Sequence, residues 1–144
     1  MILLDTNVVS EPLRPRPAAS VVAWLDAHFE SCVISTITIL ELEIGVQCLP
    51  AGHRRERLQG AVSLAVERFG PRILSFDEPS ARAAAGLFAL ARSGGSPLRQ
   101  AAIKLADLQI AGIAVANECS FATRNVGDFH GLGIDLIDPW STPS

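Results

Sequence analysis

Short apolar runs alternate with longer amphipathic stretches along the whole chain. The first run, Ile2 to Leu4, has the length and composition of a buried parallel strand. Between such runs, apolar residues return every three or four positions, which is the spacing of a helix with one buried face. We therefore predict strands at residues 2–4, 32–34, 72–76, 120–123 and 134–137, and helices at 7–13, 18–29, 37–46, 53–69, 78–92 and 103–117.

This alternation is typical of an α/β domain with a parallel central sheet and helices on both of its faces. The stretches PLRPRP and SGGSP interrupt the pattern as loops, and there is no internal repeat or interdomain linker. A chain of 144 residues fits a single domain. We expect that domain to span residues 1–140 and a frayed tail to follow at 141–144.

Four carboxylates fall at comparable places in this pattern. Asp5 directly follows the first strand, and Glu41 lies about one turn into the helix after the second strand. Asp107 lies near the start of the helix at 103–117, and Asp128 lies just beyond the fourth strand. Because sites in open parallel sheets form at the carboxyl ends of the strands, the predicted fold lets these four acids converge.

Each acid taken singly also has a simpler interpretation. Asp5 can cap the helix that begins near Asn7, Glu41 can pair with an arginine, Asp107 can interact with the helix dipole, and Asp128 can belong to a turn. However, Glu41 and Asp107 interrupt strongly apolar segments, where an unpaired carboxylate is costly. Clustered carboxylates repel one another unless a cation intervenes, and oxygen ligands favour Mg²⁺ or Mn²⁺ over zinc.

The remaining composition limits the possible functions. The net charge of −3 argues against a protein that coats nucleic acid in bulk, but local arginine clusters can still meet phosphate. The three cysteines form no CxxC pair, so we interpret them as small buried hydrophobic residues: Cys32, Cys48 and Cys119. There is no signal peptide and no apolar run long enough for a membrane span, so we expect a cytoplasmic protein.

Four segments stand out along the chain, in the order MILLDTNVVSE, STITILELEIG, LADLQIAGIAVA and FATRNVGDFHGLGIDLIDPW. Taken together, they resemble the PIN-domain family. More narrowly they resemble the VapC-type toxins of bacterial toxin–antitoxin pairs, in the subgroup that includes FitB. Because the motifs follow one another at matching separations over nearly the whole chain, the resemblance is specific.

The resemblance implies a three-layer α/β/α sandwich with a five-stranded parallel sheet. It also implies an endoribonuclease that depends on Mg²⁺ or Mn²⁺ and cleaves RNA by attack of a metal-activated water. Carried over by motif, Asp5, Glu41 and Asp107 match acids of the metal site, and the TRNVGDF motif offers Asn125 or Asp128 as the last ligand. The polar residues that the resemblance places around this site are Thr6, Asn7 and Thr123.

Two features lie outside these motif matches. We select Arg14, Arg16 and Arg124 as candidates to hold the RNA backbone. Family members often carry a proline and a serine shortly before the third acid, whereas this chain has Ala102 and Lys104 in the segment AIKLAD. The serine cap is therefore missing, and Lys104 is spaced to share a helical face with Asp107, where it would compete with a metal.

The resemblance also implies partners. They are a small VapB- or FitA-like antitoxin whose tail wraps the toxin, and a second copy of the toxin, giving a homodimer and a heterotetramer or larger complex. An alternative function is a non-catalytic PIN-fold binding module that acts with an antitoxin in assembly or DNA autoregulation. A third, a phosphatase with Asp5 as nucleophile, usually has a second aspartate where Asn7 stands.

Overall fold

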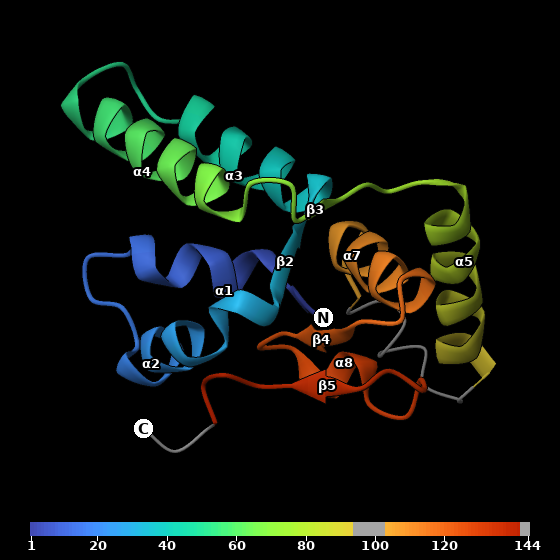
Figure 1. Ribbon diagram of the computed structural model, residues 1–144. Coiled ribbons are helices and arrows are strands. Elements are labelled where there is room, and N and C mark those ends of the chain that lie inside the picture. Colours follow the sequence, from blue (N-terminus) through green and yellow to red (C-terminus); the bar gives the residue numbers. More distant parts are fainter. Residues whose placement is uncertain (94–102, 142–144) are drawn as a thin grey trace.

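The computed structural model describes residues 1–93 and 103–141. Its strands form one five-stranded parallel sheet in the order β3-β2-β1-β4-β5, so the first strand of the chain is the central one (Figure 1). This arrangement confirms the predicted parallel sheet. The strands are β1 (Ile2–Leu4), β2 (Cys32–Ser35), β3 (Ile73–Leu74), β4 (Ser120–Ala122) and β5 (Leu136–Ile137).

Helices connect successive strands and cover the sheet on both sides, which confirms the three-layer architecture (Figure 1). The predicted helix at 7–13 is a short α-helix followed by a 3-10 turn, and the predicted helix at 18–29 likewise ends in a 3-10 turn. The helices are α1 (Thr6–Ser10), η1 (Glu11–Leu13), α2 (Ala19–His28), η2 (Phe29–Ser31), α3 (Thr36–Gln47), α4 (His53–Phe69), α5 (Glu78–Ser93), α7 (Leu105–Ala116) and α8 (Val126–Phe129).

Two apolar cores lie against opposite faces of the sheet. Because neighbouring strand residues point to opposite sides, Leu3 packs in one core and Leu4 in the other, and both are fully buried. The Leu3 core is covered mainly by α5 and α7, and the Leu4 core by α1 to α4. The sheet is thus buried on both faces, and only its edges and strand ends remain for a site.

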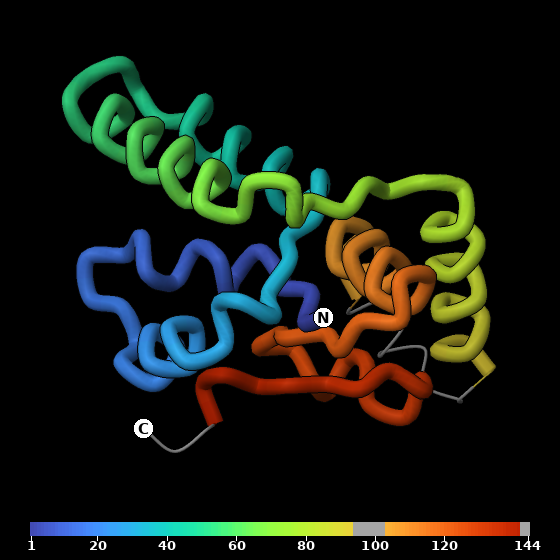
Figure 2. The backbone as a smooth tube through the Cα atoms, viewed as in Figure 1, coloured from blue at the N-terminus to red at the C-terminus, as the bar shows by residue number. Residues whose placement is uncertain are grey.

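The chain builds the sheet outward from its centre, as the tube in Figure 2 shows. It runs from β1 through β2 to β3 at one edge, and then crosses by α5 and α7 to β4 and β5 at the other. The order of strands reverses at β1, next to β4. This is the switch point at which open α/β sheets form their ligand sites.

Some predicted boundaries were wrong. The strand predicted at 72–76 is only Ile73–Leu74, and α8 was not predicted at all. The predicted helix at 103–117 begins two residues later, because the backbone of Lys104 is extended with φ −70° and ψ 148°. Lys104 therefore precedes the helix and does not share a helical face with Asp107. As expected, the side chain of the N-cap residue, Lys104, makes no capping hydrogen bond.

Cys32 and Cys119 are buried as predicted, but Cys48 is exposed at the C-cap of α3, so its prediction was wrong. Of the predicted tail, Ser141 is held by its hydroxyl, which donates to Asp138 Oδ2 across 2.8 Å, and positions 142–144 lie outside the described residues. Most of the SGGSP loop, together with Ala102, also lies outside them. None of the described helices is long and apolar enough to cross a membrane.

Candidate active site

Asp5 occupies the carboxyl end of the central strand. Its backbone N–H donates to the Ala122 carbonyl across 2.9 Å, which fixes it between β1 and β4. Its side chain is 1% exposed. One carboxylate oxygen accepts from the Thr6 N–H at 2.7 Å and the other from the Thr123 hydroxyl at 2.9 Å. Asp5 is thus the N-cap residue of α1 and also a site residue, so the two interpretations of the sequence are compatible.

Glu41 reaches the same place from α3. Ser35 ends β2 and caps this helix, because its hydroxyl accepts from the Thr38 N–H across 3.1 Å. The Thr6 hydroxyl donates to Glu41 Oε1 across 2.6 Å and lies 3.0 Å from the Thr38 hydroxyl. Thr38 was not among the predicted residues. Its position three residues before Glu41, on the buried face of the helix, is a signal that could have identified it.

Asp107 lies in the first turn of α7 and is 8% exposed. The Asn125 side chain forms a hydrogen bond with it, and Asp128 is close enough to raise its pKa. The backbone N–H of Asp128 donates to the Asn125 carbonyl at 3.0 Å, so these two residues sit in one turn. Both candidates for the last ligand therefore lie beside Asp107.

The acids influence one another electrostatically. Burial, the nearby Asp107 carboxylate and a smaller effect of Glu41 raise the pKa of Asp5 from 3.8 to about 6, against the lowering effect of its two hydrogen bonds. Burial and the carboxylates of Glu41 and Asp128 also raise the pKa of Asp107, although Lys104 and Asn125 oppose the shift. The four acids thus interact as one group at the switch point of the sheet.

The chemistry of these residues fits a hard divalent cation. Carboxylate and hydroxyl oxygens lie near Asp5, carboxylates and the Asn125 amide lie near Asp107, and the raised pKa values of both acids indicate repulsion that a cation would relieve. Within residues 1–93 and 103–141, no group of three or more acidic, histidine or cysteine side chains lies close enough together to hold a metal ion. Mg²⁺ commonly keeps several waters and takes only one or two carboxylates directly, so it does not require three protein ligands already in place.

The other predicted site residues lie at the rim or away from the acids. The Asn7 side chain is exposed on α1 and is not joined to this hydrogen-bond network in the part of the chain that is described. Arg14 is exposed and pairs with the buried Glu11 at 3.5 Å, and Arg16 is exposed in the loop before α2. The Arg124 guanidinium lies over the ring of Trp140.

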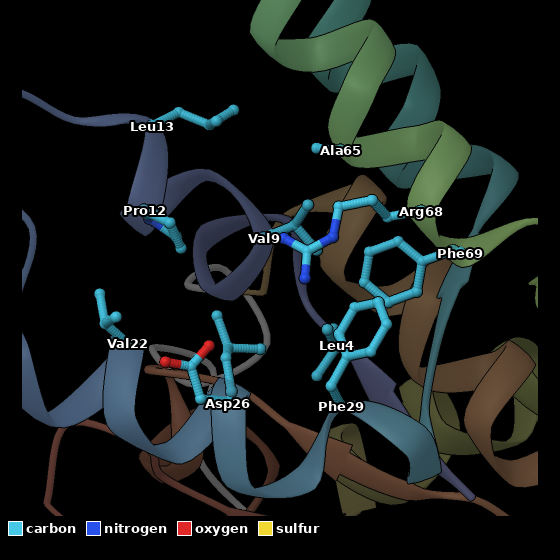
Figure 3. Close-up of a pocket in the computed structure, with 11 residues that line it drawn as sticks. Leu4, Val9, Pro12, Leu13, Val22, Asp26, Phe29, Ala65, Arg68 and Phe69 are labelled. Atoms are coloured by element: carbon cyan, nitrogen blue, oxygen red, sulfur yellow. The ribbon is translucent and has the colours of Figure 1, made fainter.

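A mainly apolar cavity of about 270 Å³ lies between α1, η1, α2 and α4 (Figure 3). Its walls come from η1, α2 and α4, with Phe29, Phe69 and Arg68 at one end. Leu4 lines it and immediately precedes Asp5, but none of the four acids does. The cavity is therefore separate from the acidic group.

Comparisons with known proteins agree with this fold. A model of the PIN domain matches residues 2–131. The chain is 41% identical to the VapC ribonuclease Y4jK of Sinorhizobium fredii in an alignment of 145 positions that covers 97% of this chain and 98% of that protein. It is also 41% identical to Toxin FitB of Neisseria gonorrhoeae, over 97% of this chain and 99% of that one. The solved structure of FitAB bound to an IR36 DNA fragment superposes with a TM-score of 0.88 and 38% identity, over 100% of this chain and 99% of that one.

Proposed function

The chain belongs to the PIN-domain family, in the group of VapC- and FitB-like proteins, and on that premise we propose that it is an endoribonuclease that depends on a divalent metal. One observation carries the proposal. Four acids from separate elements interact electrostatically at the switch point of the sheet, and the most buried of them has a pKa raised to about 6.

The proposed ligands for Mg²⁺ or Mn²⁺ are Asp5, Glu41, Asp107 and Asp128, with Asn125 as the alternative to Asp128. Such an ion, when bound, would polarise the scissile phosphate and lower the pKa of a water. Neither buried thiol competes as a nucleophile, because burial raises the pKa of Cys32 to about 11 and also raises that of Cys119.

The threonines orient the ligands in this proposal. Thr6 donates through its backbone N–H to Asp5 and through its hydroxyl to Glu41, so one residue holds two acids from different elements. Thr123 holds the second oxygen of Asp5 and accepts the Asn125 N–H across 3.1 Å. These bonds keep the carboxylates in place before metal or RNA arrives, which lowers the cost of ordering them on binding.

We further propose that the protein acts as the toxin of a toxin–antitoxin pair. Support comes from the relatives, which include a protein named Toxin FitB and the FitAB complex. The proposed partners are a FitA- or VapB-like antitoxin and a second copy of this chain, and the proposed place of action is the cytoplasm, where RNA is available.

A non-catalytic module that acts with an antitoxin on DNA is the second candidate. The FitAB relative is bound to DNA, and Lys104 lies close enough to lower the pKa of Asp107, as a competing cation would. This function requires the fold and the partner surfaces but not the metal. This second candidate predicts that neutralising the acids leaves DNA binding with the antitoxin unchanged.

The test is cleavage of single-stranded RNA by the purified chain, freed of antitoxin, with Mg²⁺ or Mn²⁺. We expect cleavage that EDTA stops, and a loss of at least about a hundredfold in rate for Asp107→Asn. Asp26→Asn is the matched control, because Asp26 is exposed on α2, away from the four acids. Full activity of Asp107→Asn would refute the proposed role of the site, and DNA binding with antitoxin but no cleavage would favour the second candidate.

A further inference from the structure

Arg124 sits at the rim of the acidic group. The residue before it, Thr123, donates to Asp5, and the residue after it, Asn125, forms a hydrogen bond with Asp107. The side chain of Arg124 is exposed, and its guanidinium carbon lies 5.2 Å from the centre of the Trp140 ring. Its backbone is thus held by two site residues while its charged group rests on an aromatic face.

Trp140 is itself fixed at this edge of the sheet. Its backbone N–H donates to Asp138 Oδ1 across 3.0 Å, and its carbonyl accepts from the Ser20 hydroxyl at 3.5 Å. The partly buried ring packs against the core under α1 to α4. The ring is therefore a stable platform that follows β5, and the backbone carbonyl of the same residue contacts the start of α2.

The guanidinium N–H groups of Arg124 remain available for a ligand. Those of Arg72, which also stacks on aromatic rings, are used in hydrogen bonds. Arg72 lies over Phe29 and Phe69, and its guanidinium donates to the carbonyls of Phe29 and Cys32. Arg124 has no such bond and no carboxylate partner among residues 1–93 and 103–141. Stacking uses the flat face of a guanidinium and leaves its in-plane N–H groups free to bind a phosphate.

We propose that Arg124 and Trp140 form a phosphate subsite for single-stranded RNA, with Arg124 as the ligand of a backbone phosphate and Trp140 as the residue that positions it. This inference rests on the proposed ribonuclease function. The four acids repel a polyanion, and a fixed cation one residue from their hydrogen-bond network offsets that repulsion at the point where the backbone must enter.

The test measures binding of a fluorescently labelled single-stranded RNA by anisotropy, over a series of KCl concentrations with millimolar Mg²⁺. All proteins carry Asp5→Asn so that RNA stays intact. Arg124→Gln should weaken binding about tenfold and reduce the slope of log affinity against log salt by about 0.7, the value for one phosphate contact on a single strand. Arg124→Lys keeps the charge and should preserve most of that slope.

Trp140 is tested by paired variants. Trp140→Phe keeps an aromatic face and should bind like the parent, whereas Trp140→Leu should weaken binding about threefold because the guanidinium is no longer held. Arg68→Gln is the control, since Arg68 lies 4.9 Å over the Phe29 ring and lines the separate apolar cavity. It should change neither affinity nor slope. In cleavage assays with Asp5 restored, Arg124→Gln and Trp140→Leu should raise KM and leave kcat nearly unchanged.

An unchanged salt slope in Arg124→Gln would overturn the subsite, and equal binding by Trp140→Leu and Trp140→Phe would overturn the positioning role. The proposed function fails in a different way. If the chain with Asp5 restored cuts no RNA with Mg²⁺ or Mn²⁺, but Arg124 still accounts for one phosphate contact, then the ribonuclease assignment falls and the subsite stands. If the chain cuts RNA and Arg124 contributes nothing to the slope, the subsite alone is refuted.

Discussion

The hydroxyl of Thr123 donates to Asp5 Oδ2 across 2.9 Å, although 118 positions separate the two residues in the chain. This bond joins the carboxyl ends of β1 and β4, the two strands on either side of the switch point. It also lowers the pKa of Asp5, against the larger raising effects of burial and of Asp107. One hydroxyl therefore links the geometry of the sheet to the charge of the site.

Replacing Thr123 by valine keeps the shape and removes the hydroxyl. The ionised Asp5 and the Asn125 N–H each lose a partner, so we expect the free energy of unfolding to fall by about 1–3 kcal/mol at neutral pH. The loss should be smaller at acidic pH, where Asp5 is protonated. Urea unfolding of the metal-free protein at both pH values measures this. Thr36→Val, at an exposed position on α3, is the control, and an equal loss at both pH values would contradict the role given to the hydroxyl.

The stability of the metal-free protein should depend on the ionisation of Asp5. Because its pKa is about 6 in the folded state and 3.8 ordinarily, the folded state binds the proton more tightly than the unfolded state. The contribution of Asp5 is therefore most favourable below 3.8, declines as the pH rises to about 6, and is constant above that. The shift corresponds to about 3 kcal/mol.

Asp5→Asn lacks this titration. In EDTA, the difference in unfolding free energy between the natural chain and Asp5→Asn should change by about this amount across the same pH window, with the variant relatively more stable at neutral pH. Using the difference cancels the titrating groups that lie away from Asp5, so what remains is the titration of Asp5 and of the acids that interact with it. A difference that does not vary with pH would show that Asp5 is not buried among like charges.

The parts that the sequence predicted well are those that depend on local pattern. A strand as apolar as Ile2–Leu4 has to be buried on both faces, and the switch point next to it follows from the alternation of strands and helices. The convergence of Asp5 with Glu41 could be predicted for that reason. The start of α7 could not, since Lys104 carries no capping side chain and its extended backbone leaves no mark in the sequence.

Contacts between segments that lie far apart in the chain also could not be predicted from the sequence. The stacking of Arg124 on Trp140 joins the end of β4 to the chain beyond β5, and no spacing rule connects these two positions. Thr38 is intermediate, because its place on the buried face of α3 was visible but its contact with Thr6 depends on how α1 and α3 pack. Cys48 was misplaced because apolar character alone does not bury a residue at a helix C-cap.

A close approach of two helices yields a prediction about stability away from the site. A Cβ added at Gly112 on α7 would lie 2.6 Å from the Ser80 carbonyl oxygen and 2.7 Å from the Ala84 Cβ on α5. We expect Gly112→Ala to lower the free energy of unfolding by about 1–3 kcal/mol or more, because the two helices must separate. Thermal and urea unfolding measure the change.

Gly86 provides the matched control on α5. A Cβ there meets nothing within 4 Å, so Gly86→Ala should stabilise the protein by about 0.5–1 kcal/mol through the higher helix propensity of alanine. If Gly112→Ala and Gly86→Ala changed the free energy of unfolding in the same direction, the tight contact of α5 with α7 would be in doubt.

Divalent metal should raise the melting temperature, because it relieves carboxylate repulsion in the folded state only. At about a hundredfold excess over its dissociation constant, Mg²⁺ or Mn²⁺ should add about 2.7 kcal/mol, which corresponds to a rise of roughly 5 °C or more. KCl at matched ionic strength is the control for screening. An equal rise in Asp5→Asn would place the effect outside the site.

The central claim is that Asp5, Glu41, Asp107 and Asp128 form one metal site, and a titration with Mn²⁺ followed by electron paramagnetic resonance tests it most directly. The signal of free Mn²⁺ reports how much ion the protein has taken up. We predict saturable binding by the natural chain and by Asp26→Asn, and at least about tenfold weaker binding by Asp5→Asn and Asp107→Asn. Binding by these two variants that equals that of the natural chain, or no binding by the natural chain itself, would contradict the claim.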